Sequence, residues 1–287
     1  MNIKLQIGLT ALVFTTFNLF SQCIKTPEGI KLDKGGRTIW SLQIDTPEGK
    51  PFIHPLNLPD GRCITDIRPK DHPWHLGLWF CWKYINGVNY WEPGRRRGVK
   101  PNGATLVTAR DIQLKGDSAL VKLDLAYRPR NSKTAAPLLT EKRVISFSAP
   151  DTKGSYSVTS EHLFKAEADV VLDRTPPQLP NQKGYSWGGY AGFSLRMSSI
   201  TKGFQRGASC GESNRGKILK NEFSWVTYTC PKTGHGVKVS VLKSTPQTRY
   251  YTCWEDNRYV SPALIYMAPI RLKKGETLSV AYRVTLY

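Results

Sequence analysis

The pattern of hydrophobic and polar residues predicts short β-strands along most of the chain. In residues 119–127, Val121, Leu123 and Leu125 alternate with polar residues. This period of two is typical of a strand with one buried face. Comparable stretches are 38–44, 143–148, 156–162, 237–242 and 278–286. No segment keeps a helical period over several turns, so we expect an all-β protein.

Turn-forming residues separate these stretches without marking a linker. The 24 glycines and 19 prolines are spread through the whole chain, which suits many tight connections. We therefore predict a single domain over 23–287, folded as an antiparallel β-sandwich with large twisted sheets.

The first 22 residues resemble a secretory signal peptide. Lys4 precedes an apolar run over 5–20 that is too short and too rich in threonine for a membrane span. Two endings remain open: cleavage after Gln22, or a lipid on Cys23. Glutamine directly before the cysteine is unfavourable for lipidation, so plain secretion is favoured. Both alternatives predict a periplasmic or extracellular protein without a transmembrane span.

The chain is strongly basic, with 41 Lys and Arg against 22 Asp and Glu and a formal charge of +19. Such a charge favours a polyanionic partner. Export and the absence of a recognition-helix pattern exclude nucleic acid, so a sulfated or uronic glycan is expected. A basic surface without a specific partner is the alternative.

Six cysteines, at 23, 63, 81, 210, 230 and 253, would be exported into an oxidising compartment. No pair has the spacing of a zinc knuckle or a redox site. We expect disulfides or inert buried thiols; six cysteines allow 15 pairings.

Residues 68–92 are the densest window of titratable and aromatic side chains in the sequence. A run rich in Trp and Phe indicates a buried strand, and Asn86-Gly87 predicts a type I′ hairpin turn, since both positions tolerate a positive φ. We expect the open end of this hairpin to gather Asp71, His72, His75 and Glu92.

Imidazoles titrate near neutral pH, so His72 and His75 are candidate catalytic acid and base, with Glu92 as their carboxylate partner. A divalent metal bound by these three residues is a less favoured alternative, because Pro73 excludes the helical spacing of a zincin. Histidines held by backbone groups at a tight turn, and a surface Glu92 paired with arginines at 95–97, are the structural alternatives.

Other segments offer candidate substrate-binding residues. Tyr190 and Arg196 belong to a glycine-rich aromatic run, where a sugar can stack on a flat ring. Trp254 is expected at a loop tip. Arg68, Arg196 and the arginines at 95–97 can bind sulfate or carboxylate through a planar fork.

Three runs carry a resemblance to a known family: Phe52-Ile-His54-Pro-Leu-Asn-Leu-Pro-Asp-Gly-Arg-Cys-Ile-Thr, Asp71-His-Pro-Trp-His-Leu-Gly-Leu-Trp-Phe, and Asn86-Gly-Val-Asn-Tyr-Trp. The chain resembles the secreted bacterial PmoA-like family, which implies a β-sandwich protein of polysaccharide-degrading bacteria. The family often has His and Arg where this chain has Trp74 and Leu76. His54, in the first run, joins the candidate substrate-binding residues.

Two functional hypotheses follow. The first is a secreted carbohydrate-active enzyme that acts on the glycosidic linkages of an acidic glycan by His and Glu acid–base chemistry. Elimination is slightly favoured over hydrolysis, because no carboxylate pair is evident. The second is a non-catalytic glycan-binding β-sandwich.

Overall fold

The computed structural model describes residues 21–92, 102–129, 134–178, 183–208, 218–220, 225–244, 250–254 and 258–287. For 218–220 and 250–254 it describes the backbone only. Within these ranges the chain forms antiparallel strands and one short 3-10 turn, η1 (Ser199–Thr201), with no α-helix. The predicted all-β sandwich and single domain are confirmed. No helix of the described residues is long and apolar enough to cross a membrane.

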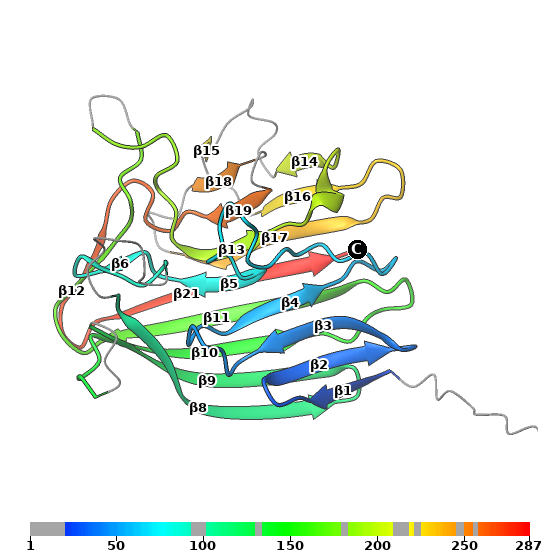
Figure 1. Cartoon of the computed structure of the whole chain (residues 1–287), viewed down its shortest axis with the longest axis horizontal. Helices are drawn as coiled ribbons and strands as arrows, with labels where there is room; N and C mark the ends of the chain where they lie inside the picture. Colours follow the sequence, from blue (N-terminus) through cyan, green and yellow to red (C-terminus); the bar gives the residue numbers. More distant parts are fainter. Residues whose placement is uncertain are drawn as a thin grey trace, which may run out of the picture.

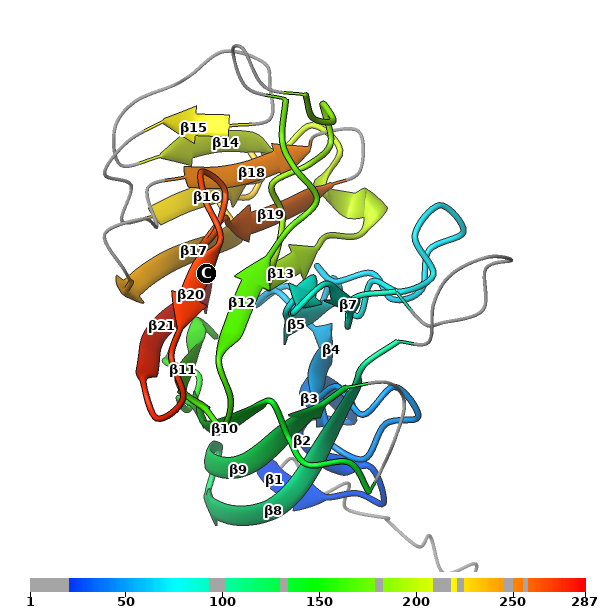
Figure 2. The same ribbon diagram turned by 90° about the vertical axis from the view of Figure 1, so that its left-hand side faces the viewer.

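Two large sheets contain most of the strands (Figures 1 and 2). In spatial order the nine-stranded sheet consists of β1 (Gln22–Lys25), β2 (Gly29–Lys34), β3 (Arg37–Gln43), β4 (Phe52–Leu56), β5 (Leu78–Cys81), β13 (Gly192–Arg196), β19 (Tyr259–Pro262), β18 (Tyr250–Trp254) and β15 (Ile218–Lys220). The eight-stranded sheet consists of β14 (Gln205–Ala208), β16 (Trp225–Thr229), β17 (Gly236–Lys243), β21 (Thr277–Leu286), β11 (Tyr156–Ala166), β10 (Leu139–Phe147), β9 (Ser118–Arg128) and β8 (Ala104–Lys115). The six stretches predicted from alternation coincide with these strands, except that 38–44 and 143–148 extend one residue past the ends of β3 and β10.

A smaller four-stranded sheet contains the predicted hairpin. Its order is β20 (Ile270–Leu272), β12 (Val170–Asp173), β6 (Tyr84–Ile85) and β7 (Val88–Asn89). Asn86 has φ 50° and Gly87 has φ 74° between β6 and β7, so the predicted Asn-Gly turn is confirmed. The Trp-rich run before it forms β5 of the nine-stranded sheet, and the hairpin is therefore shorter than predicted.

The hydrophobic core lies between the two large sheets. Phe80 of β5 packs on Phe164 of β11, with ring centroids 5.2 Å apart, and Phe193 of β13 stacks on Tyr282 of β21 at 4.6 Å. These contacts identify the inner face of the nine-stranded sheet. Side chains alternate along a strand, so Trp79 of β5 points to the outer face.

The two large sheets meet at one side of the sandwich. There β1 of one sheet lies beside β8 of the other, and the Cys23 amide donates a hydrogen bond to the Gly116 carbonyl at 3.2 Å. The side chain of Cys23 is buried, pairs across the strands with Leu32 and belongs to the core. Burial raises the pKa of its thiol to about 11, with a contribution from Asp117.

The cysteines whose side chains are described do not form disulfides. Cys23, Cys63, Cys81 and Cys230 are free thiols, so the expectation of disulfides is wrong for these four. Cys23, Cys81 and Cys230 are buried, as the alternative interpretation predicted. Burial raises the pKa of the Cys81 thiol, whereas hydrogen bonds, the largest from Thr233, lower the pKa of the Cys230 thiol to about 7. The side chains of residues 210 and 253 lie outside the described part.

Candidate functional site

The outer face of the nine-stranded sheet carries a row of buried polar and aromatic residues. In the register of β5, β13 and β19, Trp79 pairs with Ser194 and Arg196 pairs with Tyr259. The Ser194 and Tyr259 hydroxyls are 2.7 Å apart. Arg196 is among the largest fully buried side chains, and a buried guanidinium needs a partner to offset its desolvation.

A loop over residues 65–77 crosses this face and supplies that partner. Its backbone is fixed by hydrogen bonds from the Asp66 amide to the Arg196 carbonyl at 3.0 Å and from the Arg68 amide to the His75 carbonyl at 2.8 Å. Arg196 Nη2 then donates to both carboxylate oxygens of Asp71, at 3.0 and 2.9 Å. The loop is thus anchored to the sheet beside the candidate histidines.

Asp71, His72 and Arg196 form what we call the Asp71 cluster. Asp71 Oδ2 lies 2.8 Å from His72 Nδ1. Although partial burial acts to raise it, hydrogen bonds from His72 and Arg196 hold the pKa of Asp71 well below its usual value, so the carboxylate is ionised. The side chains of Asp71 and His72 are 47% and 31% exposed, whereas that of Arg196 is 1% exposed. Solvent therefore reaches the carboxylate and the imidazole but not the guanidinium.

His75 differs from His72 in its surroundings, although the two imidazoles stack at 4.6 Å. His75 is buried, and its ring also stacks on Tyr259 at 5.2 Å. Burial, with smaller contributions from the neighbouring His72 and Arg196, lowers the pKa of His75 to about 2. His75 is therefore neutral at physiological pH.

Aromatic rings extend from His75 across the outer face, and we call this set the aromatic face. Its members are His75, Trp79, Trp91, Tyr190 and Tyr259. Trp91 lies 5.5 Å from Trp79 and 5.1 Å from Tyr190, measured between ring centroids. Tyr190, which is half-buried, brings the set to the surface at the end away from the Asp71 cluster.

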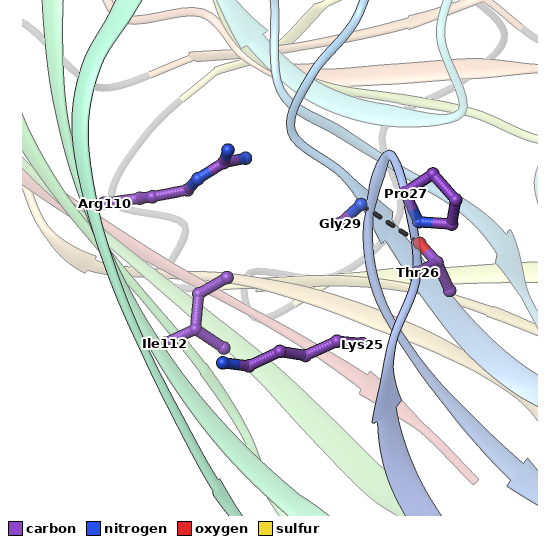
Figure 3. Close-up of a pocket in the computed structure, with 6 residues that line it drawn as sticks. All are labelled: Lys25, Thr26, Pro27, Gly29, Arg110 and Ile112. Carbon is purple, nitrogen blue, oxygen red and sulfur yellow. Dashed lines mark hydrogen bonds between the residues drawn. The ribbon is translucent and has the colours of Figure 1, made fainter.

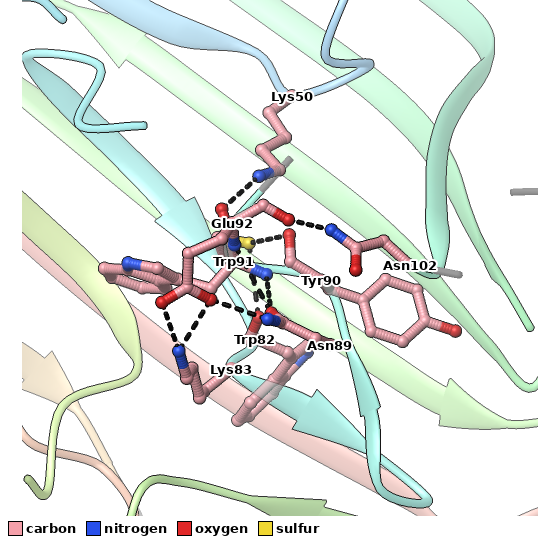
Figure 4. Close-up of polar contacts among 9 residues, drawn as sticks. Lys50, Trp82, Lys83, Asn89, Tyr90, Trp91, Glu92 and Asn102 are labelled. Carbon is pink, nitrogen blue, oxygen red and sulfur yellow. Dashed lines mark hydrogen bonds and ion pairs between the residues drawn. The ribbon is translucent and has the colours of Figure 1, made fainter. Parts of the chain in front are cut away.

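At that end lies a second polar group, the Glu92 cluster, consisting of Lys83, Asn89 and Glu92 (Figure 4). Lys83 Nζ donates to both Glu92 oxygens at 2.5 and 2.6 Å, and Asn89 Nδ2 donates to one of them at 2.6 Å. Lys83 is buried and also lies 5.2 Å from the centre of the Tyr190 ring. Burial lowers the pKa of Lys83, and Glu92 opposes this shift.

The backbone around Glu92 is also fixed by buried side chains. Lys50 Nζ donates to the Trp91 carbonyl at 2.8 Å, Asn102 Nδ2 donates to the Glu92 carbonyl, and Asn89 Oδ1 accepts from the Trp91 amide at 2.8 Å. Figure 4 shows these contacts converging on residues 89–92. The Glu92 cluster is thus a rigid part of the structure.

The structure brings some of the predicted site residues together and separates others. Asp71, His72, His75 and Arg196 are together, whereas Glu92 is bound by Lys83 and Asn89 at the other end of the aromatic face. His54 Nδ1 is bound by the Thr65 hydroxyl at 2.9 Å, and burial lowers its pKa. Arg68 pairs instead with Glu48 at 2.6 Å.

The predictions for Trp254, for the arginines at 95–97 and for a metal site either lie outside the described residues or are not supported by the structure. Trp254 pairs with Tyr259 in the register of β18 and β19, which places it on a strand instead of the predicted loop tip; its side chain lies outside the described part, as do the arginines at 95–97. No group of three or more His, Cys, Asp or Glu among the described residues could hold a metal ion. Glu92 is bound to Lys83 and so is not a third ligand beside the histidines.

Sequence reasoning missed Lys83, Tyr259 and the pairing of Arg196 with Asp71. Lys83 directly follows the buried run 78–82, and a lysine at the end of such a run is a signal that could have identified it. Tyr259 and Arg196 are brought to the site by strand pairing over a long sequence separation, which the sequence pattern does not reveal.

A separate pocket lies at the side where the two sheets meet (Figure 3). It is lined by Lys25, Thr26, Pro27, Gly29, Arg110 and Ile112. Arg110 pairs with Asp45, and none of the six residues belongs to the aromatic face. This pocket offers no acid–base pair, so we assign the candidate site to the aromatic face and its two polar clusters.

Comparison with known proteins places the chain in a family. Residues 29–287 match DUF6807, a family of unknown function, and the chain belongs to this family. The match neither supports nor opposes the PmoA-like resemblance. A search of curated protein sequences gives no match.

Solved structures with similar folds come from sugar-related proteins. The galactosidase domain of alpha-galactosidase-sucrose kinase, AgaSK, has a TM-score of 0.44 at 11% identity, covering 92% of this chain and 41% of that one. A galactose mutarotase-like protein from Lactobacillus casei has 0.42 at 11%, covering 93% and 100%. The alpha-galactosidase from Lactobacillus brevis has 0.42 at 8%, covering 93% and 39%. The chain thus spans about two fifths of the length of the two galactosidase structures. These scores are too low to transfer an activity or a substrate.

Proposed function

We propose that this chain is an exported carbohydrate-active enzyme that binds an acidic glycan over the aromatic face and moves a proton with His72. The observation that carries the proposal is the Asp71–His72 pair. An ionised carboxylate at Nδ1 favours the tautomer in which that nitrogen carries the hydrogen, which leaves Nε2 as the basic nitrogen. No described residue bonds Nε2, and the imidazole is solvent-accessible.

Two partly exposed rings on this side of the molecule support a sugar as the ligand. Sugar rings expose C–H groups that pack on flat aromatic rings, while their hydroxyls need polar partners. Tyr190 and Trp74 are half-buried rings at the surface, and the exposed polar atoms of Asp71 and His72 lie on the same face. The formal charge of +19 favours an acidic sugar, such as a uronate or a sulfated unit.

Elimination suits these residues better than hydrolysis. Hydrolysis needs a protonated carboxylic acid and a second carboxylate on either side of the anomeric centre. Asp71 is held ionised by Arg196, and Glu92 is bound by Lys83. In elimination, His72 Nε2 takes the proton from the carbon beside a uronate carboxylate. The electron pair of that C–H bond forms a C=C bond with the neighbouring carbon. The C–O bond from the neighbouring carbon to the leaving sugar breaks, and solvent protonates the leaving oxygen.

A non-catalytic glycan-binding protein is the second candidate. It is favoured by the pairing of both carboxylates with cations, because such ion pairs can serve to hold ligand-binding loops in place. The two candidates differ in one respect: only an enzyme needs His72 for turnover.

The test is to incubate the purified protein with polygalacturonate, alginate, chondroitin sulfate and neutral xylan, and to follow unsaturated sugars by their ultraviolet absorbance. We expect product from at least one acidic glycan and about a 100-fold or larger loss of rate in His72→Ala, the usual contribution of a general base. Leu163→Ala, a surface change on the other sheet, is the matched control. Binding of these glycans without product, or an unchanged rate in His72→Ala, would contradict the enzyme.

A further inference from the structure

Two aromatic side chains beyond the aromatic face are exposed to solvent. Tyr185 and Trp187 are 54% and 49% exposed, and their ring centroids lie 4.7 Å apart with an interplanar angle of 30°. Among the described residues, these two are the large aromatic side chains that are exposed. We call them the outer aromatic pair. Burial does not explain their position, because each leaves about half of its surface in water.

The backbone that carries this pair is tightly held. The Tyr185 amide donates to the Pro176 carbonyl at 2.9 Å, and the Gln178 amide donates to the Tyr185 carbonyl at 3.0 Å. A Cβ at Gly184 would lie 2.0 Å from the Pro177 carbonyl oxygen, so only glycine allows this approach. The rings are exposed on a pre-ordered backbone, which lowers the entropy cost of binding a ligand.

The same segment leads directly into the candidate site. Tyr190 belongs to the aromatic face, and the Gly189 amide before it donates to the Thr175 carbonyl at 2.8 Å. Tyr84 lies next to the Glu92 cluster, with Lys83 Nζ 5.2 Å from its ring centre. It pairs with Asp173 of β12, the strand that leads into the segment of the outer aromatic pair. Burial raises the pKa of Tyr84, and the nearby Glu92 and Tyr185 add to the effect.

We infer that the outer aromatic pair is a second sugar subsite, so that the ligand is a glycan chain of several units instead of a single sugar. This inference rests on the proposed glycan-binding function. In Figure 1 the segment between β12 and β13, which carries the pair, rises above β6 of the small sheet. A chain that occupies the Asp71 cluster and passes Tyr190 and the Glu92 cluster therefore reaches Tyr185 and Trp187.

The experiment compares the parent with the double variant Tyr185→Ala/Trp187→Ala in calorimetric titrations. The probes are oligogalacturonates and chondroitin sulfate oligosaccharides of two, four and six units. We expect the parent to bind the six-unit probe more tightly than the two-unit probe. The double variant should bind the longer probe about tenfold more weakly, the effect expected for two lost ring contacts, and the two-unit probe as well as the parent does. Leu163→Ala, which removes a 44% exposed side chain from β11, is the control.

The outcomes separate this inference from the proposed enzyme. Equal weakening for every probe length, an unchanged double variant, or a parent that binds none of the probes would each overturn the subsite. Product formation with an unchanged double variant would overturn the subsite alone. A length-dependent loss in the double variant, found without any turnover, would support the subsite and contradict the enzyme.

Discussion

Two regions of the molecule contain the same three kinds of side-chain group, a carboxylate, an imidazole and a guanidinium, in different surroundings. The Asp71 cluster joins a carboxylate, an imidazole and a guanidinium on the outer face of the nine-stranded sheet. The Glu141 cluster, which consists of Glu141, Arg143 and His162, joins the same groups between the two large sheets. Glu141 Oε1 lies 2.6 Å from Arg143 Nε and 2.7 Å from His162 Nδ1.

The two clusters differ in whether the second imidazole nitrogen remains accessible to a ligand. In the Glu141 cluster the second imidazole nitrogen, His162 Nε2, lies 2.9 Å from the Ser160 hydroxyl, and the Tyr127 hydroxyl bonds Glu141. All three side chains are buried, and both imidazole nitrogens and both carboxylate oxygens have hydrogen-bond partners within the core. In the Asp71 cluster His72 Nε2 has no described partner. A shared set of residue types therefore defines a candidate site only where an atom remains accessible to a ligand.

The largest expected effect is on stability, in Glu141→Gln. Removing this charge leaves Arg143 buried without a counter-ion, which costs about 3–5 kcal/mol in buried ion pairs. The free energy of unfolding is measured by urea denaturation. Glu161→Gln is the matched control, because Glu161 is exposed on the neighbouring strand β11 and should change stability by less than ~0.5 kcal/mol. Similar losses in both variants would contradict the assignment of the Glu141 cluster to a structural role.

His72→Ala should reduce activity much more than stability, whereas Glu141→Gln acts mainly on stability. Its imidazole is partly exposed, so we expect the unfolding free energy to change by less than ~1 kcal/mol, while turnover of an acidic glycan falls about 100-fold or more. The same urea titration and the product assay measure both effects. A loss of stability as large as that of Glu141→Gln would mean that the Asp71 cluster is structural too.

Arg196→Lys should have an intermediate effect, since Arg196 acts as a positioning residue. Arg196 Nη2 donates to both Asp71 oxygens while Nη1 lies 3.5 Å from His75 Nδ1, and the single ammonium of lysine cannot occupy both positions. A hydrogen bond to a charged group contributes about 1.5–3 kcal/mol. We expect that loss of stability, together with a shift in the pH profile of activity, because weaker hydrogen bonds from residue 196 raise the pKa of Asp71. A lower rate with an unchanged pH profile would contradict the positioning role.

The smallest expected effect is on the pH dependence of stability, through His75. Its pKa is about 2 in the folded protein and ~6.5 in the unfolded chain. Between these values the unfolded chain binds more protons, so stability falls as the pH decreases below ~6.5. His75→Asn should therefore flatten the stability curve between about pH 6.5 and 5 in urea titrations, relative to the parent. An equal slope in both proteins would contradict the burial of a neutral His75.

The fold was largely predictable because strand alternation is a local signal. The stretch 119–127 coincides with β9 (Ser118–Arg128), and Val121 and Leu123 are buried as expected. The prediction for β10 began at 143, whereas the strand begins at Leu139. Glu141 interrupts the apolar alternation there, and its burial depends on partners from β9 and β11 that the local pattern does not show.

The candidate site was predictable only where it is local in sequence. Asp71, His72 and His75 lie within five residues, and their grouping was found from their density. The joining of Arg196 to Asp71 depends on the pairing of β5 with β13, across more than 100 residues of sequence. Glu92 was expected beside the histidines because the Trp-rich strand was assigned to the hairpin; that strand instead joins the large sheet, and Glu92 is bound by Lys83.

The burial of Cys23 bears on the lipid modification that the sequence leaves open. A lipoprotein cysteine carries a group with two acyl chains on its sulfur atom, and a third acyl chain, where present, is on its amino group. In this fold that sulfur lies in the core, behind the β1 strand that connects the two sheets through the Cys23 amide. A thioether-linked lipid would need to leave the core, and β1 would have to move with it. Membrane attachment through Cys23 and the β1–β8 contact are therefore mutually exclusive arrangements of the N-terminal part of the domain.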